Sequence, residues 1–217
     1  RQLYSDQDSL PIYLYWSPAG DSVSFIANHP EGLALHLALS EGIDEPELVA
    51  VSPSTLFWDW MPDGSQVLVH SGFTARNTDD SKLVFIPLDS AADSQEIVQS
   101  GFFQAPAVAS DGRFYGYSDQ DPAGRRWLSV WDIDRNQQVE LIFHQGVVAM
   151  GFSPTDAMLA YTSPVRPAHS FYGPLRLLDL ESGDPRLLVP ETVLAFFWSP
   201  DGRSIAYLTL TDIEGPP

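Results

Sequence analysis

A five-residue pattern recurs along the chain at nearly constant spacing, and this repeat constrains the fold more than any other feature. Each copy opens with an apolar residue and ends in a turn that contains glycine or aspartate. The last residues of successive copies lie 44, 48, 44 and 46 positions apart. The copies occupy residues 16–20 (WSPAG), 60–64 (WMPDG), 108–112 (VASDG), 152–156 (FSPTD) and 198–202 (WSPDG). A period in the forties with short extended segments is typical of a β-propeller, which uses one four-stranded blade per repeat.

The residues around each copy predict the four strands of a blade. An apolar run before the copy predicts the innermost strand, strand A, and the turn leads into strand B. The third and fifth residues after each copy are apolar, so both side chains face one side of strand B. The residue between them is often small, as close packing of neighbouring blades requires: Ser24, Gly116, Ala160 and Ala206. Strand C is expected at residues 33–39, 83–88, 128–133 and 175–180, and strand D at 47–51, 96–99, 138–143 and 186–189.

The strand order predicts an all-β chain that forms part of a propeller of four-stranded antiparallel blades, with about 4.5 blades present. Residues 1–10 are expected to supply a strand D, because residues 1–4 resemble the later D strands. Full blades are expected at about residues 11–54, 55–102, 103–146 and 147–192, and a half blade at 193–217. A closed ring would need the strand C that the half blade lacks, so we expect the chain to be a fragment of a larger propeller. Propellers have roughly four to eight blades, and we expect roughly six to eight in this one.

The charge balance bears on the partners of the chain. Eleven basic residues stand against 29 acidic ones, which gives a net charge of −18. Such a field repels phosphate backbones and anionic membrane surfaces, so we expect no nucleic-acid partner. No uninterrupted apolar run of about 18 residues predicts membrane insertion. The chain has no cysteine, which excludes disulfides, thiol catalysis and thiolate metal sites in these residues.

Residues 198–207 (WSPDGRSIAY) closely resemble the WD-like repeats of TolB-type β-propellers. They also resemble the propeller domains of prolyl-oligopeptidase-type peptidases. The third copy departs from the pattern because residues 108–110 lack the aromatic residue and the proline, and in the fourth Asp156 replaces glycine. The resemblance implies a bacterial, non-catalytic scaffold that binds a protein or peptide, and it favours a periplasmic or other extracytoplasmic location. Its alternative implication is the substrate-gating propeller of a serine peptidase whose catalytic domain is not in this chain.

The connections between strands B and C are the candidate binding surface. In a propeller the B–C and D–A loops share one face. The A–B turns are repetitive here, whereas the B–C loops vary in length and content, as binding loops on a rigid scaffold do. They are rich in arginine and aromatic residues, which are common anchors of protein interfaces. The candidate partner-binding residues are Arg76, Arg125, Arg126, Arg166, His169 and Tyr172.

Some of these residues also have a purely structural interpretation. Arg125 and Arg126 can pair with the nearby Asp119 and Asp121, in which case they hold the loop rather than a partner. Tyr172 can likewise pack its own loop. The sequence does not choose between the two interpretations.

The sequence contains no catalytic or cofactor motif. Patterns of the Gly-x-Ser-x-Gly, Gly-x-Gly-x-x-Gly and Walker kinds are absent. None of the five histidines has the local spacing of a metal site. A ring of His29, His70 and His144 at strand ends could bind a metal, but the simpler interpretation is that all five histidines are isolated polar residues. We therefore expect no catalytic residue, cofactor or metal, with a stand-alone lyase or glycosidase as a further hypothesis.

Overall fold

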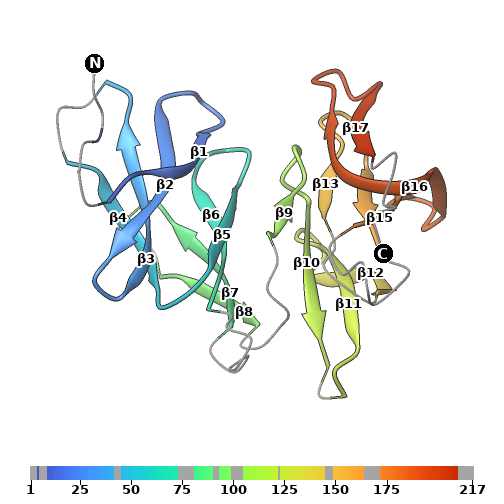
Figure 1. Ribbon diagram of the computed structural model, residues 1–217, viewed down its shortest axis with the longest axis horizontal. Helices are drawn as coiled ribbons and strands as arrows, with labels where there is room; N and C mark the ends of the chain where they lie inside the picture. Colours follow the sequence, from blue (N-terminus) through green and yellow to red (C-terminus); the bar gives the residue numbers. More distant parts are fainter. Residues whose placement is uncertain are drawn as a thin grey trace, which may run out of the picture. The chain divides into compact units, whose positions relative to one another are not determined.

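The computed structural model of the protein describes residue 4 and residues 9–41, 45–72, 81–89, 93–98, 105–121, 123–144, 149–163 and 172–209. The chain divides into two compact units, Arg1–Phe103 and Gln104–Pro217 (Figure 1). All regular elements of the described residues are strands. These residues include no helix that is long and apolar enough to cross a membrane.

The first unit contains two four-stranded sheets. In each sheet the strands lie in chain order, and each strand pairs antiparallel with the next. The first sheet consists of β1 (Ile12–Trp16), β2 (Ser22–His29), β3 (Gly32–Leu39) and β4 (Glu47–Ser52). The second consists of β5 (Leu56–Trp60), β6 (Gln66–Ser71), β7 (Lys82–Pro87) and β8 (Gln95–Val98).

The second unit contains a four-stranded and a five-stranded sheet, again antiparallel and in chain order. The four-stranded sheet consists of β9 (Ala107–Val108), β10 (Phe114–Gln120), β11 (Arg126–Asp132) and β12 (Gln137–His144). The other consists of β13 (Met150–Phe152), β14 (Met158–Thr162), β15 (Gly173–Asp179), β16 (Pro185–Trp198) and β17 (Ile205–Thr209). The predicted all-β propeller fold with four-stranded antiparallel blades is confirmed.

Strand β16 differs from the prediction. We expected a strand D at residues 186–189 and a separate strand A before Trp198, but one strand covers both. It pairs with β15 up to Val193 and with β17 from Val193 onward, and the register shifts near that residue. No glycine or asparagine interrupts it, so no tight turn forms. Pro190, which lacks a backbone N–H, lies beside the shift, where a missing ladder bond is tolerated.

The predicted first strand is only partly within the described residues. Arg1, Gln2 and Leu3 lie outside them, and Tyr4 belongs to no strand. The ring of Tyr4 packs on Phe25 of β2 with 4.8 Å between centroids. Tyr4 therefore helps to cover the face of the first blade that carries Phe25, which is buried.

The two blades of the first unit are joined by tryptophans that dock on a serine. Trp58 and Trp60 of β5 both donate their indole N–H to the Oγ of Ser24 in β2, at 2.8 and 3.0 Å. The Ser24 hydroxyl in turn donates to the carbonyl of Tyr15, at 3.1 Å. All three side chains are buried, so these hydrogen bonds satisfy groups that water cannot reach.

The same contact recurs in the second unit with different residues. A Cβ added to Gly116 of β10 would lie 3.0 Å from the Sδ of Met150, and 3.7 Å from the ring of Phe152. Further along, the Trp198 indole donates to the carbonyl of Gly151 at 3.0 Å. The prediction that small residues of strand B permit close packing is therefore confirmed at Gly116. Trp16, which has no preceding blade in the described residues, is 61% exposed.

The turns between strands A and B use two geometries. Gly20, Gly64, Gly112 and Gly202 have φ between 68° and 73°, a region that glycine adopts without steric cost. The fourth copy of the repeat has Asp156 in that position. There the Oγ of Ser153 accepts the N–H groups of Thr155 and Asp156, at 3.3 and 3.2 Å. The side chain thus stabilises a turn that needs no left-handed residue at this position.

We predict that Ser24→Ala lowers the free energy of unfolding by about 2–4 kcal/mol, because it leaves two buried indole N–H groups without an acceptor. Urea unfolding followed by circular dichroism measures this value. In a Trp58→Phe/Trp60→Phe background the same substitution should lower the free energy of unfolding by less than about 1 kcal/mol, because no indole N–H is left without an acceptor. Equal costs in the two backgrounds would show that the hydrogen bonds do not couple the blades.

We predict that Gly116→Val destabilises the second unit by about 1–3 kcal/mol, because the new side chain overlaps Met150. Shortening the opposing side chain with Met150→Ala should recover part of this loss in the double variant. The measurement is a double-mutant cycle in urea. Strictly additive losses would mean that the two strands do not touch in solution.

Candidate binding surface

Three of the six predicted partner-binding residues fall within the described part of the chain. Arg125, Arg126 and Tyr172 belong to the second unit, whereas Arg76, Arg166 and His169 lie outside the described residues. Arg125 belongs to the connection from β10 to β11, Arg126 is the first residue of β11, and Tyr172 immediately precedes β15 in the next blade. Tyr172 is 40% exposed. The two B–C connections therefore each place at least one predicted residue at the start of a strand C.

Asp121 organises the turn between β10 and β11. Its Oδ1 accepts the backbone N–H groups of Ala123 and Arg125, at 3.0 and 2.9 Å. Its Oδ2 accepts the Nε–H of Arg125 at 2.7 Å. The N–H and the guanidinium of Arg125 favour the ionised form, so the pKa of the Asp121 carboxyl is lower than usual. The structural interpretation of Arg125 as the partner of Asp121 is confirmed.

Arg125 nevertheless remains accessible, because its side chain is 64% exposed. Its guanidinium lies over the ring of Trp127, 5.8 Å from the centroid, which is within the range of a cation–π contact. Trp127 meets Phe143 of β12 edge to face, with 5.4 Å between centroids, and Phe143 is 49% exposed. We name Arg125, Trp127 and Phe143 the blade-3 patch.

Arg126 does not join this patch. It is the first residue of β11, where it pairs with Gln120 of β10 and His144 of β12. Successive residues of a strand point to opposite faces, so Arg126 lies on the other face of the sheet from Trp127. Its Nε donates to the Gln120 side chain at 3.4 Å, and partial burial lowers the pKa of its guanidinium. The two adjacent arginines therefore do not form one surface.

Sequence reasoning missed Trp127 and Phe143. The predicted strand C begins at residue 128, so Trp127 falls in the loop before it, and Phe143 is the last residue of a predicted strand D. In the structure the two residues are direct cross-strand partners. A register counted from the C–D turn would pair Trp127 with Ile142. The register shifts by one residue between Val130 and Trp131, and this shift brings Phe143 opposite Trp127, where cross-strand neighbours share a face.

The three histidines considered for a metal ring each have a local partner. His70 Nε2 lies 3.0 Å from the Oγ of Ser81, and His144 Nε2 lies 2.9 Å from the Oγ of Ser118. The Nδ1 of His29 accepts the N–H of Glu31 at 3.2 Å. Among the described ranges of the chain, no three His, Cys, Asp or Glu side chains come together as a metal site. Each of the three histidines thus has a polar partner within its own blade.

No family model and no curated protein matches the chain by sequence. Solved structures do match. A TolB from Acinetobacter baumannii aligns with a TM-score of 0.64 and 17% identity, over 94% of this chain and 55% of that one. A putative TolB from Agrobacterium tumefaciens aligns with a TM-score of 0.61 and 19% identity, over 90% of this chain and 73% of that one.

An oligogalacturonate lyase from Vibrio parahaemolyticus aligns with a TM-score of 0.68 and 12% identity, over 95% of this chain and 61% of that one. The chain thus spans less than two thirds of this lyase and of the Acinetobacter TolB. At such low identity the likeness concerns the fold alone, because one fold supports many functions. The resemblance to TolB-type propellers that the repeat predicted is therefore confirmed at the level of structure.

Proposed function

We propose that the chain is a non-catalytic scaffold of the TolB-like kind that binds a protein or peptide through the B–C and D–A loops of its blades. The observation that carries this proposal is the blade-3 patch. It combines an exposed arginine with two aromatic residues in edge-to-face contact at the B–C end of a blade. Arginine and aromatic side chains are enriched among the residues that dominate binding energy in protein interfaces.

The geometry of Arg125 suits recognition of an acidic or carbonyl group. The ion pair with Asp121 uses the Nε–H, and the exposed side chain leaves its terminal nitrogen atoms accessible to a partner. Contacts with Asp121 and Trp127 on either side hold the guanidinium in place before a partner arrives. Such preorganisation reduces the side-chain entropy that binding must overcome.

The other predicted residues extend this surface in the proposal. Arg76, Arg166 and His169 belong to B–C loops outside the described residues, and Tyr172 lies at the end of one of them. In a propeller such loops share one face, so we expect them to contact the same partner. The resemblance to TolB-type repeats supports a periplasmic or other extracytoplasmic location for this interaction.

A second candidate is a carbohydrate lyase. The observation in its favour is the fold shared with oligogalacturonate lyase structures, one of them in complex with manganese. A third candidate, the gating propeller of a peptidase, requires a hydrolase domain outside residues 1–217. We place the binding scaffold first because the blade-3 patch is a feature of this chain itself, whereas the lyase likeness concerns only the fold.

We predict that Arg125→Ala/Phe143→Ser and Arg76→Ala/Arg166→Ala/Tyr172→Ala each reduce capture of the partner by about tenfold, as expected for loss of interface anchors. Immobilised protein is incubated with an extract of the source cells, and bound proteins are quantified by mass spectrometry. The melting temperature should stay within about 2 °C of the parent, because exposed ion pairs contribute little stability.

The matched control is Arg135→Ala, which removes an exposed arginine from the C–D turn of the same blade as the patch. It should capture the same proteins as the unmodified chain. If both loop variants also capture them unchanged, the B–C surface is not the binding site.

The lyase candidate makes a different prediction. We expect the purified chain to leave oligogalacturonate uncleaved, with or without added Mn²⁺, when the unsaturated product is followed by ultraviolet absorbance. A rate that is proportional to protein concentration and is lost on heat denaturation would contradict the non-catalytic assignment.

A further inference from the structure

Tyrosines gather where the innermost strands of the first two blades meet. The ring centroid of Tyr13 in β1 lies 5.7 Å from that of Phe57 in β5. The ring of Tyr15 meets that of Trp58 edge to face, with 5.2 Å between centroids. Trp58 is buried, but Tyr13 and Tyr15 are 53% and 50% exposed. Two tyrosines that pack against the next blade thus also present ring surface to solvent.

The two tyrosines lie on the side of β1 that the second blade covers. Tyr15 pairs with Ser24, which accepts the Trp58 indole N–H, and cross-strand partners share a face. Leu14 points the other way and lines a pocket with Phe25. Strand A of each blade borders the central channel, which stays open in a complete propeller. The exposure of the tyrosines is therefore not that of a blade face without its neighbour.

The backbone of β1 is distorted at Tyr13. Three positions separate Ile12 from Tyr15, but only two separate their partners in β2, so β1 carries a one-residue bulge. Within the bulge Tyr13 has φ of 51°, a region in which a bulky side chain is an outlier. Such strain clusters at binding sites, where the surrounding structure holds it. The bulge thus indicates a role for the Tyr13 side chain that glycine, the unstrained choice, does not supply.

A carboxylate adjoins the exposed rings. Asp59 of β5 acts on the hydroxyl of Tyr15, because partial burial, and next the Asp59 carboxylate, raise the pKa of Tyr15. Tyr15 therefore stays neutral at physiological pH. The Asp59 Oδ1 accepts the backbone N–H of Trp60 at 2.9 Å, which holds the carboxylate in place. The cluster thus combines aromatic rings with one fixed negative charge.

Electrostatics favour a cation at this cluster. Residues 1–103, which make up the first unit, carry 15 acidic and three basic side chains, a net charge of −12. Within the part of this unit that the structure describes, Lys82 is the one lysine or arginine, and it pairs with Glu96 at 3.4 Å. A field of this sign attracts cations and repels anions. The charge complementary to the cluster is therefore positive.

We propose that this cluster binds the guanidinium group of an arginine side chain. We name it the tyrosine surface, and it consists of Tyr13, Tyr15, Phe57 and Asp59. A guanidinium is planar and weakly hydrated, so it stacks on aromatic rings while its N–H groups donate to a carboxylate. An ammonium is more strongly hydrated, and a quaternary ammonium has no N–H for Asp59. The site takes the opposite charge from the blade-3 patch and does not depend on the function proposed for that patch.

The test uses the 217-residue chain labelled with 3-fluorotyrosine, and N-acetyl-arginine amide as the probe. The chain has eight tyrosines, and the variants Tyr13→Phe and Tyr15→Phe identify two of the ¹⁹F resonances. We expect saturable shifts of these two, with a Kd on the order of 1 mM for a single side chain. The remaining resonances should stay nearly unchanged, which also shows that each variant is folded.

Two related compounds test the chemistry of the probe. N-acetyl-citrulline amide has nearly the same shape without the charge, and it should bind at least about tenfold more weakly. N-acetyl-lysine amide with a free ε-ammonium keeps the charge without the planar group, and it should bind about threefold more weakly.

Substitutions test the residues. Asp59→Asn should weaken binding about fivefold, because the amide loses the charge-assisted hydrogen bond but can still accept the Trp60 N–H. Tyr13→Gly should weaken it similarly and keep the melting temperature within about 2 °C of the parent, since relief of the strained φ offsets the lost ring contact. The matched control Trp16→Leu removes an exposed aromatic side chain from the same strand and should bind like the parent.

Several outcomes would overturn the proposal. One is the absence of a shift at Tyr13 and Tyr15 with about 20 mM probe, where even a millimolar site is occupied. Equal binding of the citrulline compound would show an apolar contact that does not select charge. Equal shifts of all eight tyrosines would show that the probe follows the acidic field of the whole chain. A lower melting temperature of Tyr13→Gly with unchanged affinity would assign Tyr13 to packing alone.

Discussion

The docking of strand A of one blade on strand B of the preceding blade is the interaction on which each unit depends. A single four-stranded blade has two faces and cannot bury both alone, so neighbouring blades must cover them. In the first unit the contact is made by two tryptophans on the Ser24 hydroxyl, and in the second by Met150 and Phe152 against Gly116. At Trp60 and Phe152 the aromatic residue that opens the repeat thus reaches the preceding blade, and a small residue receives it.

Packing between blades gives the B–C connections a rigid base, which a binding loop needs. The strands are fixed by ladder hydrogen bonds and by the contacts between blades, so the B–C connections are attached at both ends to ordered strands. The turn at Asp121 shows the consequence, because one carboxylate holds the backbone and the guanidinium of Arg125 together. An exposed arginine is thereby held over Trp127 instead of sampling many rotamers. Because the strands and not the loops hold the blades together, the loop sequences can vary while the fold stays the same.

Much of the fold could be predicted from the sequence because the repeat combines a fixed period with turn residues of known geometry. The small residue at position 116 predicted the close packing between blades that the structure has there. The continuity of β16 was not predictable from the repeat, since it depends on a register shift that residues 190–193 allow but do not require. The turn at Asp156 likewise depends on a local serine side chain, Ser153, that substitutes for glycine.

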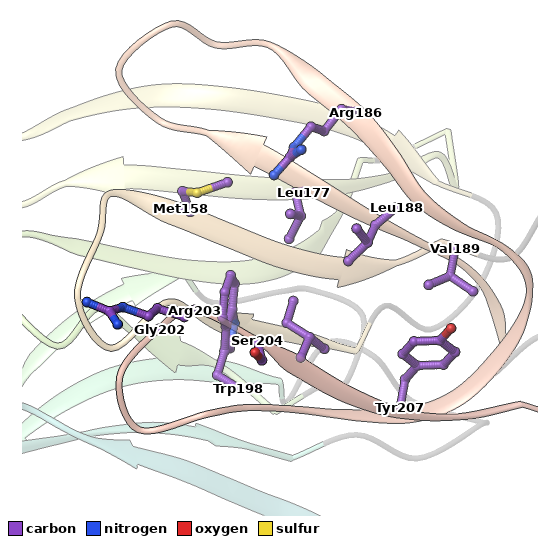
Figure 2. A pocket seen from close by; sticks show the side chains of 11 residues that line it. Met158, Leu177, Arg186, Leu188, Val189, Trp198, Gly202, Arg203, Ser204 and Tyr207 are labelled. Carbon is purple, nitrogen blue, oxygen red and sulfur yellow. The ribbon is translucent and has the colours of Figure 1, made fainter.

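The candidate sites were less predictable than the fold. Loop composition identified Arg125 and Arg126 together, yet strand alternation separates them onto opposite faces of the sheet. Trp127 and Phe143 form the patch because of cross-strand pairing, which depends on register and not on composition. A pocket of the second unit is lined by Met158, Leu177, Arg186 and Tyr207 from four different strands (Figure 2), and no local sequence pattern marks such a set.

Native-state hydrogen exchange of the first unit tests most directly whether contacts between blades hold it together. We expect the slowest amides of β2 and β6, one strand B from each blade, to exchange with the same free energy of opening. Both values should fall with the same slope as denaturant is added, because neither blade persists without the other. A difference of more than about 2 kcal/mol between the two strands, with β2 opening while β6 stays protected, would contradict it.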